Sequence, residues 1–133
     1  MKELTLAVVG IDHPNPDKSR SSRRFELLQC DPGEPVELRP EPRNKHDSHA
    51  VAVWSARGVQ IGYLSAERAP WIGRRLGQEE CVAVFQALAG PVAYIRVRFG
   101  GGAPTLPPAG ERPTPRDDAD GFHADPEGSP WGA

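Results

Sequence analysis

The segment from Arg43 to His49 holds the residues best suited to chemistry, because it places imidazole, carboxylate, amide and cationic side chains within seven positions. His46 and Asp47 are adjacent, and His49 follows shortly after them. Imidazoles and carboxylates bind metals and transfer protons. Two histidines on one loop, without a dependable third ligand, are insufficient for a specific metal site. We therefore expect no bound metal.

The sequence also lacks the arrangements that indicate catalysis. It has no Gly-x-Ser-x-Gly segment, no phosphate-binding Gly-rich loop with a lysine, and no cysteine with a convincing base partner. Cys30 and Cys81 stand in unrelated contexts, so we expect small buried hydrophobic residues and neither a disulfide nor a thiolate metal site. The sequence predicts a protein that binds a partner, without enzymatic activity and without a cofactor.

A second polar cluster places four positive charges within seven positions: Lys18, Arg20, Arg23 and Arg24. Clusters of this kind are more often solvated loops than nucleic-acid sites. Residues 1–100 carry 14 Lys and Arg against 12 Asp and Glu, whereas residues 101–133 carry 2 against 6. The body is only mildly basic, so a site for a polyanion must depend on local clusters.

The composition fits one small domain. The chain has 133 residues, of which 38% are hydrophobic and 26% charged. From Gly100 onward it becomes rich in Pro and Gly with few aliphatic residues, which predicts a domain over residues 1–99 and a disordered acidic tail over residues 100–133. Neither a signal peptide nor an apolar run of about 18 residues is present, so we expect a cytoplasmic protein without a membrane partner.

Hydrophobic periodicity predicts the elements that must position these residues. Alternating or continuous apolar runs predict six strands, at residues 4–11, 36–39, 50–54, 59–64, 81–88 and 92–99. Ser22 is placed to cap a short helix with Phe25 and Leu28 on one face. A second helix begins near Ala69, with Pro70 in its first turn and an inner face that includes Ile72 and Leu76.

In the last strand, Ile95, Val97 and Phe99 are predicted to point inward. The chain has few of the long crossover helices that a parallel sheet requires. The expected fold is mostly β: a small, closed or nearly closed barrel with two short helices. Closure removes the exposed strand edges that a free antiparallel sheet of this size would carry.

One long pattern carries a family resemblance. It runs from Pro32 to Val53 and reads Pro-Gly-x-x-Val-x-Leu-x-x-Glu-Pro-x-Asn-x-x-Asp-x-x-Ala-Val-x-Val, with Gly62-Tyr63-Leu64 following before a helix. The pattern closely resembles the HIRAN domain, and the resemblance extends from about Leu4 to Phe99. It implies a six-stranded OB-like or SH3-like barrel with two helices, here in a stand-alone prokaryotic-type member.

The resemblance also implies a function. HIRAN domains occur fused to DNA-remodelling helicases and nucleases, and members with a known role bind single-stranded DNA and favour its free 3′ end. The expected partners are therefore single-stranded DNA or DNA ends, and a helicase or nuclease, in DNA repair or replication-fork processing. Barrels of this kind bind strands with a basic groove and aromatic stacking surfaces.

Site residues follow from the resemblance by position. Asp47 matches the acid that accepts a hydrogen bond from a terminal sugar hydroxyl, and His46 stands where relatives often place an aromatic ring. Tyr63 is placed to stack on a base or bond a phosphate. Asp12 and Ala66 stand where relatives can carry basic residues, which predicts weaker phosphate contacts. The expected nucleic-acid-binding residues are His13, Arg23, Arg24, Arg43, His46, Asp47 and Tyr63.

Several residues also have a structural interpretation. Asn44 and Asp47 can hold a tight loop through hydrogen bonds from backbone N–H groups to their side chains, instead of contacting a ligand. Tyr63 can be a residue of the barrel wall, and Glu41 is expected to be structural. The alternative function is a protein-interaction adaptor that keeps the barrel, does not bind DNA, and engages a partner through its acidic tail.

Overall fold

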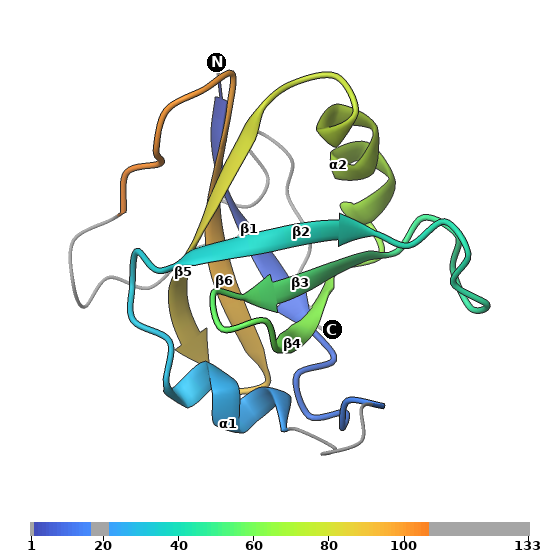
Figure 1. The fold of residues 1–133 in the computed structure, drawn as a ribbon, viewed down its shortest axis with the longest axis vertical. Coiled ribbons are helices and arrows are strands. Elements are labelled where there is room, and N and C mark those ends of the chain that lie inside the picture. The colour runs from blue at the N-terminus through green and yellow to red at the C-terminus, as the bar shows by residue number, and fades with distance from the viewer. Residues whose placement is uncertain (1, 17–21, 107–133) are drawn as a thin grey trace.

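The computed structural model describes residues 2–16 and 22–106 of the chain. Within these ranges the elements are β1 (Lys2–Val9), α1 (Arg23–Leu28), β2 (Pro35–Pro40), β3 (Val51–Ser55), β4 (Gln60–Leu64), α2 (Ala69–Leu76), β5 (Cys81–Ala89) and β6 (Val92–Phe99). The predicted fold class is confirmed, with six strands and two helices (Figure 1). None of the helices in the described part of the chain is long and apolar enough to span a membrane.

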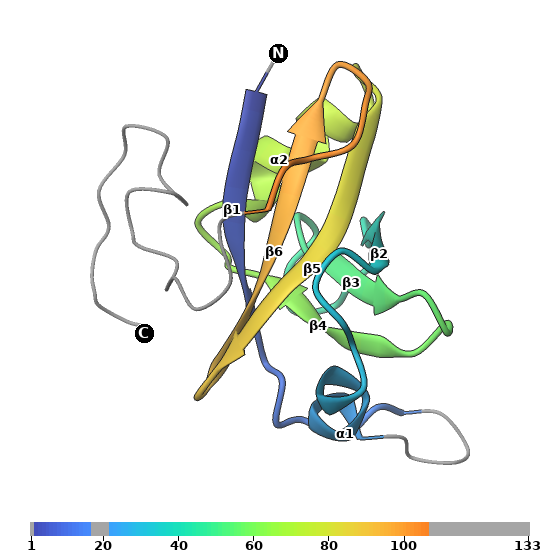
Figure 2. The same ribbon diagram turned by 90° about the vertical axis from the view of Figure 1, so that its left-hand side faces the viewer.

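The six strands form one closed barrel in which every pairing is antiparallel, in the order β1-β4-β3-β2-β5-β6. β1 and β6 pair along almost their whole length, from Lys2 opposite Phe99 to Val8 opposite Ala93. Figure 2 shows β1, β6 and β5 as three long neighbouring strands. Because β1 pairs with both β6 and β4, it closes the barrel.

Side-chain alternation along the strands builds the core. The inward positions of β6 are Ile95, Val97 and Phe99, as predicted, and none of the three is exposed to solvent. Burying one side chain of this size stabilises the folded state by about 1.5–3 kcal/mol. Cys30 and Cys81 are unpaired, and burial raises the pKa of each thiol to about 11, so both stay protonated.

Helix α1 begins as predicted, with the Ser22 hydroxyl accepting a hydrogen bond from the backbone N–H of Phe25. Its buried residues are Arg23, Glu26 and Leu27, whereas Phe25 and Leu28 share the opposite, exposed face. Arg57 in the β3–β4 turn donates to Glu34 and Glu26, and these two bonds raise its pKa. The turn is thereby tied to the helix.

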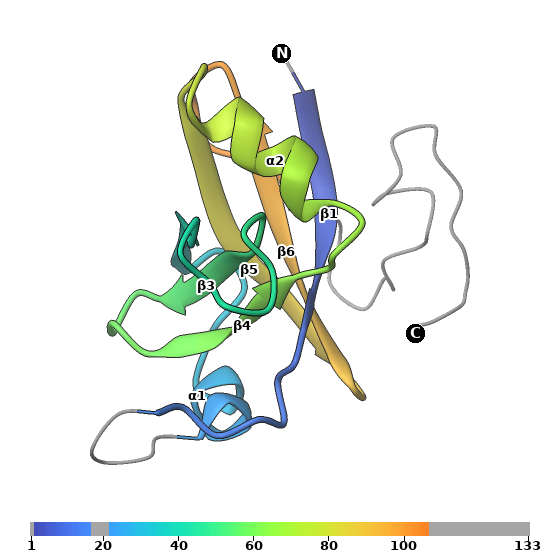
Figure 3. The same ribbon diagram turned by 90° about the vertical axis from the view of Figure 1, so that its right-hand side faces the viewer.

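Helix α2 contains Pro70 in its first turn, where no helical N–H is needed, as predicted. Ile72 is fully buried and Leu76 packs partly against the core, so the predicted inner face is confirmed. Figure 3 shows α2 above the loop that joins β2 and β3.

Residues 100–106 run back along the barrel. Thr105 donates hydrogen bonds to Glu3 from its backbone N–H and its hydroxyl, and Arg98 donates to the Gly101 carbonyl. Partial burial alone would raise the pKa of Glu3, but the bonds from Thr105 and Arg98 hold it below its usual value. The rest of the predicted disordered tail, residues 107–133, lies outside the described residues.

A bulge in β4 determines which way Tyr63 points. Ala52 pairs with Tyr63 and Val53 with Gly62, but Trp54 pairs with Gln60, so Ile61 is the extra residue. Ile61 is fully buried, and the shift turns Tyr63 to the outer face, where it lies beside Ala52. Simple alternation would have put Ile61 and Tyr63 on the same face.

Gly62 is required because β1 passes directly over it. A Cβ at this position would lie 2.5 Å from the Val9 carbonyl oxygen and 2.7 Å from Val8 Cγ1, and the Gly62 φ angle is +155°. Close backbone approach of this kind is available only to glycine.

We predict that Gly62→Ala destabilises the barrel by about 1–3 kcal/mol, because the methyl group must push β1 away from β4. The control is Gly73→Ala in α2, where the new Cβ would lie 3.7 Å from Val51 in ordinary contact. That change should be neutral or stabilise by up to about 1 kcal/mol. Urea unfolding measures both, and an equal effect of the two variants would contradict the close approach.

Candidate functional site

The loop of residues 41–50, between β2 and β3, projects from the barrel and is held by its own hydrogen bonds (Figure 1). The backbone N–H of Glu41 donates to the Ala50 carbonyl at 2.8 Å, which fixes the two ends. Asn44 Oδ1 accepts from the backbone N–H groups of His46 and Asp47, at 2.8 and 3.1 Å. Asp47 Oδ1 accepts from the His49 N–H at 2.9 Å. Both side chains therefore hold the loop.

The Glu41 carboxylate joins this loop to the barrel. Its Oε1 accepts a hydrogen bond from Asn44 Nδ2 at 2.9 Å and another from the Tyr63 hydroxyl at 2.9 Å. Tyr63 lies on β4, 22 positions further along the chain. Glu41 therefore has a structural role, because one of its carboxylate oxygens fixes both the loop and the Tyr63 ring.

Tyr63 is contacted from its other side by Arg23, whose Cζ lies 5.6 Å from the ring centroid. Arg23 is only 6% exposed. It donates to Asn15 Oδ1 at 2.7 Å and to the Gly10 carbonyl at 2.8 Å. Burial lowers the pKa of its guanidinium, although Tyr63 and Glu41 act in the opposite direction. Arg23 thus supports the Tyr63 ring from within.

Arg24, the next residue, is engaged elsewhere. It bonds both carboxylate oxygens of Asp12, at 2.6 and 3.0 Å, and the Gly90 carbonyl at 3.0 Å. This contact lowers the pKa of Asp12 and raises that of Arg24. His13 is exposed in the turn after β1, beside Gly10. Lys18 and Arg20 fall outside the described residues.

The tip of the loop carries groups without internal partners. Arg43, Lys45 and His46 are exposed, and within residues 2–16 and 22–106 their side chains form no hydrogen bond or ion pair. Of the other described Lys and Arg side chains, Arg74 on α2 alone shares this property. Oδ2 of Asp47 likewise accepts no hydrogen bond from any described group. Glu41, Pro42, Arg43 and Asn44, in the first half of the loop, line a shallow hollow.

Of the predicted site residues, Tyr63 contacts Arg23 directly and is linked through Glu41 and Asn44 to the loop that carries Arg43, His46 and Asp47. In the described part of the chain, the Arg24 side chain forms no hydrogen bond or ion pair with this group. His13 lies beside Gly10, whose carbonyl accepts a hydrogen bond from Arg23. The sequence alone did not predict that Glu41 joins the loop to Tyr63. The three-residue spacing between Glu41 and Asn44 was the signal that could have indicated a contact between them. No group of three potential metal ligands exists among the described residues.

Comparison with known proteins gives the following matches. The sequence model of the HIRAN domain matches residues 18–94. The crystal structure of the HIRAN domain of human HLTF superposes with a TM-score of 0.55 and 20% identity, covering 73% of this chain and 74% of that one. The crystal structure of a protein from Lactobacillus plantarum superposes with a TM-score of 0.58 and 19% identity, covering 74% and 93%. At these identities the two structures establish a shared fold. No curated protein matches the chain.

The bonding pattern separates the two loop side chains by their effect on stability. We predict that Asn44→Ala lowers the free energy of unfolding by about 1–3 kcal/mol, since two N–H groups and Glu41 lose a partner. Asp47→Ala removes one acceptor and should cost less, about 0.5–1.5 kcal/mol. Thermal or urea unfolding of the two variants provides the comparison. A larger loss for Asp47→Ala would mean that Asp47 is the main support of the loop.

Proposed function

Because the chain belongs to the HIRAN domain family, we propose that it binds single-stranded DNA and recognises the 3′ end of the strand. The matched residues 18–94 include the whole 41–50 loop and Tyr63. Family membership supports a DNA-binding role in general. The preference for a single strand with a free 3′ end is the finer part of the proposal, and it depends on the chemistry of this loop.

The observation that carries the proposal is the collection of unpartnered groups at the loop tip. Arg43 and Lys45 are positioned to neutralise phosphates, and most of the other described cations are already paired within the protein. The rings of His46 and Tyr63 provide surfaces on which a base can stack. With only two unpaired cations on the 41–50 loop, binding should be weak and only shallowly dependent on salt.

Asp47 supplies the recognition of the strand end. A carboxylate next to phosphates is unfavourable unless it accepts a hydrogen bond. Its Oδ1 is occupied by the His49 N–H, and its Oδ2 is open. A 3′-terminal hydroxyl donates to such an oxygen, whereas a 3′ phosphate has only acceptors and a negative charge near neutral pH. The strand terminus is therefore the part of DNA that best matches this site.

The role that follows is non-catalytic. The domain would hold a DNA end while a helicase or nuclease on another chain acts in DNA repair or at a replication fork. The described residues offer no group of metal ligands for phosphodiester chemistry. All of the proposed contacts are hydrogen bonds, ion pairs and stacking.

One observation favours the adaptor alternative. Phe25 and Leu28 on α1 are 64% and 67% exposed, an apolar pair on the face of the helix that turns away from the barrel. Exposed apolar pairs of this kind are suited to a protein partner. If the adaptor function is correct, Phe25→Ser abolishes capture of that partner and no oligonucleotide binds.

The deciding variant is Asp47→Asn, which keeps the acceptor for the His49 N–H and removes the carboxylate charge. Wild-type protein should bind an oligonucleotide with a 3′ hydroxyl at least about tenfold more tightly than one with a 3′ phosphate, because a charge-assisted hydrogen bond contributes about 1.5–3 kcal/mol. In Asp47→Asn this preference should disappear.

The matched control is Asp31→Asn, which makes the same charge change at an exposed turn before β2. Fluorescence anisotropy with labelled oligonucleotides, including a 5′-phosphorylated and an end-blocked one, measures all affinities. Retention of the 3′ preference in folded Asp47→Asn would exclude Asp47 as the recognition group.

A further inference from the structure

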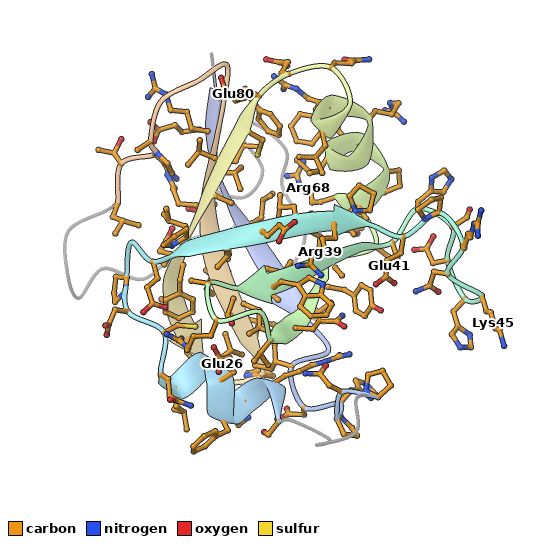
Figure 4. All side chains as sticks on the ribbon, in the orientation of Figure 1. Glu26, Arg39, Glu41, Lys45, Arg68 and Glu80 are labelled. Atoms are coloured by element: carbon orange, nitrogen blue, oxygen red, sulfur yellow. The ribbon has the colours of Figure 1, made fainter. Side chains whose placement is uncertain are left out.

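The outer face of the β2–β3–β4 sheet continues from the Tyr63 ring. Arg39, Ala52 and Tyr63 form one cross-strand row, and Glu37, Trp54 and Gln60 form the next. Arg39, Glu37 and Trp54 point outward because their neighbours Leu38 and Val53 face the core, whereas Ala52 and Gln60 of the same rows are buried. In Figure 4, Arg39, Glu41 and Lys45 follow one another from the middle of the sheet to the tip of the 41–50 loop.

Arg39 lies on Trp54. Its Cζ is 4.1 Å from the ring centroid, which is a stacking distance and shorter than the 5.6 Å between Arg23 and Tyr63. Arg39 also donates to Glu37 Oε1 at 3.0 Å, so its charge is balanced within the protein. Its side chain remains 45% exposed. A planar cation fixed on an aromatic ring, with its remaining surface open to solvent, is itself a platform for a nucleic-acid base.

The Trp54 indole N–H is buried and has no acceptor among the described residues, so no hydrogen bond fixes the ring, and the contact with Arg39 is one that holds it. The comparable contact of Arg75 with Phe99 differs, because Phe99 is completely buried and that pair offers no ring surface to a ligand. Arg39 and Trp54 are the pair that presents stacked planar groups on the same face as Tyr63.

The two aromatic residues are near neighbours on this face. Tyr63 pairs with Ala52, two positions before Trp54, so Tyr63 and Trp54 lie in adjacent cross-strand rows with the β4 bulge between them. Ala52, in the same row as Tyr63, is fully buried and offers no surface of its own to a strand. Two rings in adjacent rows are placed to contact different bases of one extended strand.

We propose that Arg39 stacked on Trp54 forms a second base-stacking subsite, which receives an interior base of the strand whose 3′ end is held by the 41–50 loop. This inference rests on the proposed function and adds the path of the strand across the barrel. Because Glu37 already balances Arg39, the subsite acts through stacking and not through net charge.

An abasic scan tests the subsite. Oligonucleotides with a free 3′ hydroxyl carry one abasic residue at each successive position from the 3′ end, and anisotropy gives the affinity of each. For wild-type protein, an abasic residue at one interior position should weaken binding about 5- to 150-fold, the loss expected for one base stack. In Arg39→Lys, which keeps the charge without the planar group, that position should become insensitive while the terminal position keeps its effect.

Trp54→Leu should behave in the same way, and Arg39→Lys keeps the test decisive if Trp54→Leu fails to fold. The control is Arg74→Ala, which removes an exposed cation on α2 and should leave the scan unchanged. Arg43→Ala should reduce the slope of the logarithm of affinity against the logarithm of salt concentration by about 0.7, whereas Arg39→Lys should not change this slope.

The failures are distinguishable. If the wild-type protein binds no oligonucleotide, both the proposed function and this subsite are wrong. If it binds the 3′ end but the scan is flat at interior positions, or Arg39→Lys retains the wild-type scan, the subsite is wrong and the proposed function stands.

Discussion

The side of the barrel that carries Tyr63 and the 41–50 loop depends on one carboxylate oxygen, Oε1 of Glu41. It accepts from the Tyr63 hydroxyl and from the Asn44 amide, so a strand residue and a loop residue share one acceptor. Hydrogen bonds to an ionised acceptor contribute about 1.5–3 kcal/mol, enough to fix both donors. Asn44 then uses its carbonyl oxygen for the loop backbone. The Glu41 carboxylate thus has hydrogen-bond donors within the protein at Oε1. Asp47, the other acid of the loop, has an oxygen, Oδ2, that accepts no hydrogen bond from a described group.

Closure of the barrel brings these groups together. Tyr63 reaches Glu41 because β3 separates β4 from β2 by a single strand and because the β4 bulge turns the ring outward. β1 passes closely over Gly62, which lies between the bulge residue and Tyr63. The 41–50 loop, which carries the proposed contacts, is thus joined to the barrel wall through Glu41. This division is typical of proteins that place function on loops and stability in the scaffold.

The sequence predicted the elements well, but it did not predict the contacts that hold Arg23 and Tyr63. Strand alternation, the Ser22 cap and Pro70 are local signals, and the structure confirms each of them. Arg23 shows why these contacts could not be predicted. In the sequence it belongs to a basic cluster, but in the structure it donates hydrogen bonds to Asn15 and Gly10, which the turn after β1 brings close to it. The outward direction of Tyr63 was likewise hidden, because a bulge shifts the alternation on which sequence reasoning depends.

The central claim is that the strand end lies on the 41–50 loop and Tyr63, and amide chemical-shift mapping tests it most directly. A ¹⁵N-labelled sample is titrated with a short oligonucleotide that ends in a free 3′ hydroxyl. The largest changes should fall on His46, Asp47 and His49, whose N–H groups bond to the loop side chains, and on Tyr63. Changes confined to α1 around Phe25 and Leu28, or no changes at all, would contradict the account.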